Sequence, residues 1–438
     1  MAIIYNSLKN ATQDIWQETK ANYLFLPLLL VLTTIPLRYA YNSISVGVFI
    51  GLSLLLFRKK NVVFCRDLIY PVLIYIVMAA SLLWTIDFAE TVATLFKVFP
   101  FLLIPVCFMI NKPFTVIQYQ KIIHYFGVVY VVYAVFYLLK AVVRFLTEKD
   151  SSVFFYHELV TQDVNAIHVS VYMTLAFTAF LIKKNKTFWD KFSLAVLAVL
   201  IVLLSSKNVL LVFLFLNALY LFFFLDFKNR KRVALAVAGL GLVFAAVFFQ
   251  KIRQRFEIEV SSNLTQNTIN REISSDKGTV YNVSVYEAWN NETFNQNDFF
   301  PGAALRVYQF RIFLEMLREN PNWMLGYGLN ATKPKIQEKR IEHNLYAGYD
   351  EFNFHNQYVQ FFAEIGLPGF VLLLLMLGIC LKNAFQSKDF VYISFSVLMI
   401  SLFLTESFLS RQRGIIFFIV FYGLFAISKQ RFDKRLIQ

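Results

Sequence analysis

Apolar stretches long enough to cross a membrane recur along most of this chain, separated by short polar breaks. A helix needs about 20 apolar residues to cross the hydrocarbon core of a bilayer. On this criterion the sequence predicts about twelve spans. They lie at 22–38, 44–58, 67–84, 92–110, 122–142, 166–182, 190–205, 208–225, 233–250, 367–382, 389–409 and 415–427. The predicted fold class is therefore an all-α polytopic membrane protein.

The composition also indicates a membrane protein. Hydrophobic residues make up 58% of the 438 residues and charged residues 16%, against about 25% charged residues in a typical soluble domain. The net charge of +14 does not predict a nucleic-acid partner, because the lysines and arginines gather at the ends of the apolar runs. The three cysteines lie in or beside apolar runs, which predicts buried thiols without a disulfide framework.

The positive residues predict the orientation. One side of the predicted membrane collects the basic clusters at 58–60, 112–121, 183–186, 228–232, 382–388 and 429–435. The short loops on the other side are poorer in positive charge. Both termini are therefore predicted to be cytoplasmic. Residues 1–20 are interpreted as a cytoplasmic or interfacial arm, because no small-residue cleavage site follows the first apolar run.

The spans divide unevenly along the chain. Residues 1–250 are predicted to form an N-terminal bundle of about nine helices, residues 251–354 a large outer loop, and residues 355–438 about three more helices. A transporter or flippase built from repeats would show two matched halves. The uneven division argues against that class, which stays as an alternative.

The outer loop contains one well-formed helical pattern. Apolar residues recur at helical spacing over Ala303–Glu319, and Asn320-Pro321 ends the pattern, which predicts an amphipathic helix. The following Gly326-Tyr327-Gly328 predicts a tight turn where the backbone can approach a ligand closely. Tyr327 is therefore a candidate substrate contact.

His355 lies where the outer loop ends and the next membrane helix begins. Asn356 follows it and is a further candidate substrate contact. Gly366-Leu367-Pro368-Gly369 then predicts that one helical segment ends and the next enters the membrane at a new angle. A histidine at such a place can have a pKa near neutrality, as a general base requires. The alternative is a histidine that caps a helix at the interface.

Several cations are predicted on the same outer side. Lys207, flanked by serines and an asparagine, resembles an anion site, with snorkelling at a helix end as the alternative. Arg306 and Arg311 lie on the predicted loop helix, Arg306 in its first turn. A cation there interacts unfavourably with the helix dipole, and a bound anion would offset this small cost. Arg411 and Arg413 are candidates for substrate or headgroup binding, or are simply solvated.

These residues favour one type of reaction. The acidic residues predicted on the outer face show no carboxylate–histidine spacing suited to a metal, so neither a metal nor another cofactor is expected. They are Glu257, Glu259, Asp276, Glu287, Asp298, Glu342, Asp350 and Glu351. Transfer of a sugar from a lipid pyrophosphate needs a base for the acceptor hydroxyl, which a histidine can supply. It also needs positive charge for the departing diphosphate, which arginine and lysine can supply.

Two motifs carry a family resemblance. The spacing His355-Asn356-x9-Gly366-x2-Gly369, and the preceding segment from Arg306 through Asn320-Pro321 to Gly328, resemble the signature of the bacterial O-antigen ligase and polymerase superfamily. The predicted twelve-span layout, with its large periplasmic loop between the ninth and tenth spans, is also similar to the ligases.

The resemblance implies a metal-independent, inverting glycosyltransferase with the C-type membrane fold. It would be a multi-pass protein of the bacterial inner membrane, surrounded by membrane lipids, with its active site facing the periplasm. The donor would be an undecaprenyl-pyrophosphate-linked glycan and the acceptor a lipid A–core oligosaccharide. The leading hypothesis is O-antigen ligase, and the alternative is an O-antigen polymerase of the same superfamily.

The resemblance also implies roles for single residues. His355 matches the histidine of the family's motif, and Arg306 matches the arginine of the large loop. Lys207 falls where the ligases usually carry an arginine. Lysine keeps the charge at this position but loses the bidentate fork of the guanidinium group.

Overall fold

The computed structural model describes residues 2–160, 164–225 and 261–435, apart from 267, 271–272 and 275–277. The predicted span at 233–250 and the first part of the outer loop lie outside these residues. The protein is mostly helical, at 74%. A small three-stranded sheet joins β1 (Thr268–Ile269) to β2 (Tyr281–Asn282) antiparallel and β2 to β3 (Asp298–Phe299) parallel.

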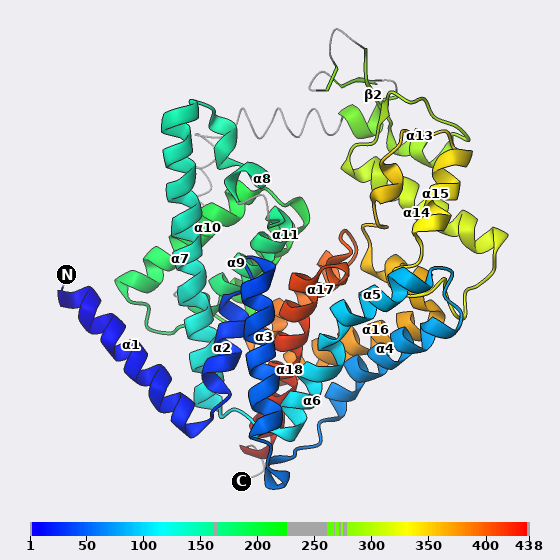
Figure 1. The fold of residues 1–438 in the computed structure, drawn as a ribbon. Helices are drawn as coiled ribbons and strands as arrows, with labels where there is room; N and C mark the ends of the chain where they lie inside the picture. Colours follow the sequence, from blue (N-terminus) through cyan, green and yellow to red (C-terminus); the bar gives the residue numbers. More distant parts are fainter. Residues whose placement is uncertain are drawn as a thin grey trace.

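The helices follow the apolar pattern of the sequence (Figure 1). The first group is α1 (Ala2–Ala21), α2 (Phe25–Thr33), α3 (Tyr39–Leu55), α4 (Ile69–Ala80), α5 (Phe88–Val98), α6 (Pro100–Ile110), α7 (Val116–Glu148), α8 (Tyr156–Leu159), α9 (Ala166–Leu181), α10 (Phe188–Leu204) and α11 (Lys207–Phe223). The second group is α13 (Val285–Asn290), α14 (Gly302–Glu319), α15 (Lys333–Glu342), α16 (Gln357–Ser387), α17 (Phe390–Leu402) and α18 (Gln412–Arg435). Short 3-10 turns lie at Lys59–Asn61, Arg66–Leu68, Ser81–Leu83, Ser151–Phe154, Tyr349–Glu351 and Phe408–Ser410.

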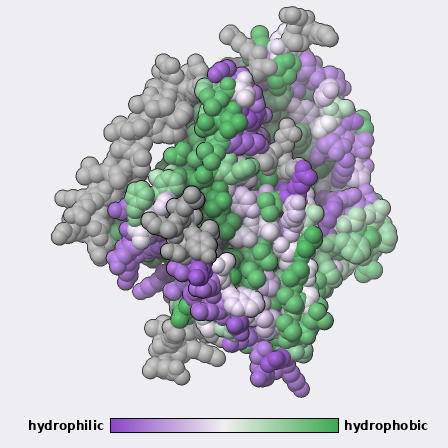
Figure 2. Space-filling model, turned by 60° about the vertical axis from the view of Figure 1, so that its left-hand side comes forward, coloured by the Kyte–Doolittle hydropathy of each residue, from purple (hydrophilic) through white to green (hydrophobic). Residues whose placement is uncertain are grey.

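Four helical stretches among the described residues are long and apolar enough to cross a membrane. They are Arg66–Leu83, Phe88–Ile110, Val116–Glu148 and Gln357–Ser387. Further apolar helices are shorter, at Tyr39–Leu55, Ala166–Leu181, Lys207–Phe223, Phe390–Leu402 and Gln412–Ser428. Figure 2 shows patches of hydrophobic residues between hydrophilic ones on one face of the molecule.

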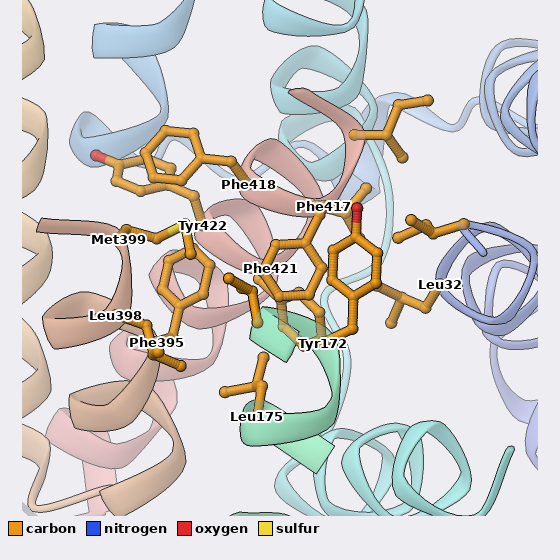
Figure 3. Close-up of a cluster of buried hydrophobic side chains, with 14 of the residues drawn as sticks. Leu32, Tyr172, Leu175, Phe395, Leu398, Met399, Phe417, Phe418, Phe421 and Tyr422 are labelled. Atoms are coloured by element: carbon orange, nitrogen blue, oxygen red, sulfur yellow. The ribbon is translucent and has the colours of Figure 1, made fainter. Parts of the chain in front are cut away.

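The core of the helical bundle forms around α18. Every residue from Arg413 to Ser428 is buried, which is typical of a helix enclosed by protein on all sides. Helices α6, α7, α16 and α17 pack against it. Figure 3 shows Phe417 and Phe421 of α18 pointing toward Tyr172 of α9 and Phe395 of α17. The predicted cysteine environment is confirmed, since all three cysteines are buried and free.

The predicted break within α16 is confirmed. Gly366 has φ +64° and Ile365 is also non-helical, so the helix changes direction before Pro368. A side chain at position 366 would be strained by this φ, and its Cβ would lie 2.3 Å from the carbonyl oxygen of Met324. Glycine is therefore required here by both the turn and the close approach of the outer loop.

Helices α13, α14 and α15 form an outer unit with the small sheet, at one end of the molecule beyond α5 and α16 (Figure 1). The predicted amphipathic helix at 303–319 is confirmed as α14. The unit has its own buried cluster, which includes Phe300, Tyr308 and Phe313. The cluster also includes Val359 and Ala363 of α16, so the unit packs onto the first segment of that helix.

The predicted turn at Gly326–Gly328 exists, and both glycines have positive φ. It approaches protein backbone, however, where we had predicted a ligand. The backbone N–H of Tyr327 donates to the carbonyl of Ala363, and that of Gly328 to the carbonyl of Glu364, both at 2.8 Å. A Cβ at Gly326 would lie 2.6 Å from the Glu364 backbone. The turn therefore docks the outer unit onto the first segment of α16.

Candidate active site

The loop between α17 and α18, Phe403–Arg411, lies at the centre of the candidate site. The predicted span at 389–409 is too long, because α17 ends at Leu402 and polar residues of the loop follow it. The carbonyl of Phe403 accepts a hydrogen bond from the backbone N–H of Gln357 at 2.8 Å. The carbonyl of Leu404 accepts one from Nδ2 of Asn356 at 3.2 Å. The start of α16 is therefore fixed against this loop.

His355 lies two residues before the start of α16, with φ +46°. The cap of the helix is Asn356, whose Oδ1 accepts from the backbone N–H groups of Tyr358 and Val359 at 3.0 and 3.1 Å. The alternative that His355 itself caps the helix is therefore wrong. Both ends of the Asn356 amide are engaged inside the protein, which argues against the substrate contact predicted for it.

The hydrogen bonds of His355 determine which ring nitrogen carries its proton. Nδ1 lies 2.9 Å from the carbonyl oxygen of Asn353 and 3.0 Å from Oε1 of Gln309. A backbone carbonyl can only accept, so Nδ1 donates, and the neutral ring has its lone pair on Nε2. Among the described residues none is hydrogen-bonded to Nε2. This nitrogen is therefore available to take a proton.

The surroundings also keep the ring neutral. Burial lowers the pKa of His355, and the positive charges of Arg306 and Arg411 lower it further, although the hydrogen bond to Asn353 raises it. The net pKa lies below the usual 6.5. His355 is therefore in its basic form at neutral pH, as a general base requires.

Helix α14 supplies two partners of this site. Gln309, which is 3% exposed, contacts His355. Arg306 lies three residues earlier on the same side of the helix. Its Nε donates to the carbonyl of Thr405 at 2.9 Å, and its Nη1 donates to the carbonyl of Gly302 at 2.7 Å. One helix therefore positions both the orienting amide and the cation.

Glu406 is a site residue that was not predicted from the sequence. Its Oε1 accepts from Nη2 of Arg306 at 3.1 Å, and its side chain is 14% exposed. Burial raises the pKa of Glu406, and the nearby charges of Arg306 and Arg411 lower it. The available signal was a single carboxylate in the turn between two apolar runs, five residues before the exposed Arg411.

Lys207 is exposed at the first position of α11. The next residue, Asn208, ties this end of α11 to the loop and to the end of α17. The side chain of Asn208 donates to the carbonyl of Ser401 at 2.8 Å and to the hydroxyl of Thr405 at 2.6 Å. Because Thr405 also holds Arg306, the beginning of α11 and the beginning of α14 are joined through one residue.

Three predicted substrate contacts have other roles. Arg311 is held by the Glu315 carboxylate at 2.7 Å and the carbonyl of Asn291 at 2.6 Å. Arg413, which is 3% exposed, donates to the carbonyl of Leu37 at 2.7 Å and lies 4.2 Å from the centroid of the Tyr39 ring. The buried hydroxyl of Tyr327 donates to the carbonyl of Met316 at 2.9 Å. These contacts argue against a direct role in substrate binding for all three residues.

The site thus combines the neutral His355, Arg306 hydrogen-bonded to the loop, and two exposed cations, Lys207 and Arg411, around one loop. Within the described ranges, no group of three His, Cys, Asp or Glu side chains could hold a metal ion. Such an arrangement can accept a proton at one point and bind an anion beside it.

Comparison with known families found one similarity, which covers part of the chain. A family model described as O-antigen ligase matches residues 192–374. The resemblance to the O-antigen ligase and polymerase superfamily is confirmed. The matched part contains Lys207, Arg306 and His355, whereas Glu406 and Arg411 lie beyond it. No curated protein matches the chain.

The O-antigen ligase match supports a ligase- or polymerase-type function, broadly defined. Members of the family are membrane glycosyltransferase-like enzymes of lipopolysaccharide biosynthesis and act in general on polyprenyl-linked glycans and lipid A–core substrates. The apolar helices agree with a membrane protein.

Proposed function

We propose that this protein is an O-antigen ligase that transfers a glycan from undecaprenyl pyrophosphate to a hydroxyl of a lipid A–core oligosaccharide. The observation that carries the proposal is the state of His355. Its Nδ1 is fixed as a donor, no residue that the structure describes is hydrogen-bonded to its Nε2, and the charge of Arg306 acts on its pKa. A base of this kind next to cations suits glycosyl transfer from a diphosphate, in a family whose members handle such donors.

The reaction takes place in one displacement. Nε2 of His355 takes the proton of the acceptor hydroxyl while its oxygen attacks the anomeric carbon of the donor sugar. The bond between that carbon and the diphosphate oxygen breaks on the opposite face, so the configuration is inverted. The electron pair leaves with the diphosphate, and His355 carries the proton until it is released to solvent.

The cations stabilise the leaving group. Arg306 is oriented by Thr405 and Glu406 and keeps N–H groups that can donate to a phosphate oxygen. Lys207 and Arg411 are exposed on the two segments that meet at Thr405. Charge-assisted hydrogen bonds from these groups strengthen as the diphosphate gains charge, so no metal is required for this step.

The proposal includes a location and an architecture. Residues 1–250 and 355–438 form the membrane part with about twelve spans in total, and residues 251–354 form a periplasmic loop. The excess of positive residues on the opposite side supports cytoplasmic termini and an active site that faces the periplasm of the bacterial inner membrane. The second candidate is an O-antigen polymerase, because the family match supports both functions.

The lipopolysaccharide of a deletion strain tests the proposal. If the protein is the ligase, deletion leaves full-length polymer on the lipid carrier and none on the core. Complementation with the wild-type gene restores the polymer on the core, and complementation with His355→Ala does not. Core that bears a single repeat would instead identify a polymerase. An unchanged profile would refute both functions.

Metal dependence is a separate test. Transfer by the purified protein should persist in excess EDTA, because the positive charge near the diphosphate comes from side chains. Loss of transfer that Mg²⁺ restores would contradict the metal-free mechanism. A metal-dependent glycosyltransferase assayed in the same buffer provides the control for chelation.

A further inference from the structure

Two large aromatic side chains are exposed side by side on the outer unit. Trp289 of α13 is 44% exposed and Phe310 of α14 is 43% exposed. Their ring centroids lie 6.3 Å apart and their planes differ by 24°. Neighbouring apolar rings that are exposed together form a small apolar patch, and such patches commonly mark binding sites.

The pair lies next to the candidate active site along α14. Phe310 follows Arg306 by four residues, so the two side chains lie on the same side of the helix, one turn and about 6 Å apart. A sugar ring is of similar length. Rings that lie on Phe310 and Trp289 are therefore within reach of a diphosphate held at Arg306.

The aromatic pair is held in place by the protein. Nη1 of Arg311 donates to the carbonyls of Asn291 at 2.6 Å and Ala288 at 3.4 Å, which ties α13 to α14. Ser284 and Glu287 form a reciprocal capping box that fixes the start of α13. The two rings are therefore ordered before a ligand arrives, which lowers the entropic cost of binding.

Lipid is not a suitable occupant for this surface. Helix α13 lies at the end of the outer unit away from α4, α5 and α16 (Figure 1). The other exposed residues of α13 are Tyr286 and Asn290, which carry hydrogen-bonding groups, whereas the apolar Val285 is half-buried and Ala288 is buried. An exposed aromatic face bordered by hydrogen-bonding groups suits a ligand with both C–H faces and hydroxyl groups.

We propose that Trp289 and Phe310 form a platform that binds the pyranose rings of the donor glycan nearest to the diphosphate. The C–H face of a pyranose lies against the negative face of an aromatic ring, and the indole N–H can donate to a sugar hydroxyl. The inference rests on the proposed function for the identity of the ligand. It assigns to Arg311 the task of bracing the platform, where the sequence had predicted a direct substrate contact.

The test uses the full-length protein in detergent and a soluble oligosaccharide released from the O-antigen of the host strain. Binding is followed by calorimetry, independently of transfer. Trp289→Ala and Phe310→Ala should each weaken binding about three- to tenfold. Trp289→Phe, which keeps a ring, should recover most of the affinity. His355→Ala should bind as the wild type does, because it changes only the proton acceptor.

A matched control is Trp323→Ala. Trp323 is 50% exposed on the same unit, but its backbone adjoins α16. This variant should leave the affinity for the oligosaccharide unchanged. Equal affinity in the wild type, Trp289→Ala and Phe310→Ala, with unchanged unfolding temperatures, would overturn the platform.

The two proposals fail in different ways. Binding that depends on Trp289, in a protein whose deletion leaves the lipopolysaccharide profile unchanged, would support the platform and refute the ligase function. Normal transfer by Trp289→Ala with an unchanged KM for the donor would refute the platform and leave the ligase function intact. Raised KM with little change in kcat is the expected result.

Discussion

The chain contains two His-Asn pairs, and the structure uses them differently. His343 is 4% exposed, with Nδ1 3.0 Å from the Tyr308 hydroxyl and Nε2 3.2 Å from a Glu315 oxygen. The His355 ring is hydrogen-bonded to the described part of the chain at Nδ1 alone. Burial lowers the pKa of both histidines. A histidine enclosed at both nitrogens stabilises structure, whereas one that is oriented at one nitrogen and unengaged at the other can react.

Helix α14 explains the difference, because it contacts both histidines. Tyr308 and Glu315 lie on one side of the helix, seven residues apart, and face His343. Arg306 and Gln309 lie on another side and face the candidate site. One side of the helix therefore stabilises the fold and the other side contributes to the candidate site. Substitutions on the first side should lower stability, and those on the second should lower activity.

The largest expected effect comes from substituting the two histidines. His355→Ala should lower transfer about 10²- to 10⁴-fold, since a general base is lost, while the unfolding temperature changes little. His343→Ala should retain transfer but lower the free energy of unfolding by about 1–3 kcal/mol, because buried polar partners are left unpaired. Donor turnover and thermal unfolding check the two variants. Wild-type transfer by His355→Ala would refute the assignment.

Arg306 should show the next largest effect. Arg306→Ala should lower transfer about 10²-fold, since a donor to the leaving group is lost. Arg306→Lys keeps the charge, but an ammonium group lacks the planar guanidinium that donates to both Thr405 and Glu406. An intermediate loss of transfer is therefore expected. The matched control is Arg311→Lys on the same helix, which should affect transfer less. Steady-state kinetics with the lipid-linked donor would measure these losses. Equal kcat/KM values for wild type and Arg306→Ala would exclude the arginine from the reaction.

Lys207 should show a smaller effect because its ammonium is exposed. Lys207→Ala should weaken transfer about tenfold through the loss of one charged contact to the diphosphate. Lys207→Arg should be tolerated, since the resemblance places an arginine at this position in the ligases. The KM for the donor is the measurement that checks both variants. If the two variants have the same activity, Lys207 does not bind phosphate.

The parts of the fold set by local pattern were predictable from sequence. The helix at Gly302–Glu319 and the break at Gly366 follow from apolar periodicity and from glycine chemistry. The low pKa of His355 was not predictable, because it depends on burial and on the charges of Arg306 and Arg411, which lie far from His355 in the chain. Glu406 was missed for the same reason, since only the folded loop places this carboxylate against Arg306. Arg311 and Arg413 were assigned by charge alone, and burial with backbone carbonyls gave them structural roles.

The pH dependence gives the smallest and most specific test. Only neutral His355 can accept the proton, so kcat/KM falls as pH drops through its pKa, which lies below 6.5. Arg411 lowers this pKa by its charge. Arg411→Gln should therefore raise the pKa and move the acidic limb upward by about a few tenths of a pH unit. Arg411→Lys keeps the charge and should leave the limb in place. A limb that stays fixed in Arg411→Gln, or that moves to lower pH, would show that Arg411 does not act on His355.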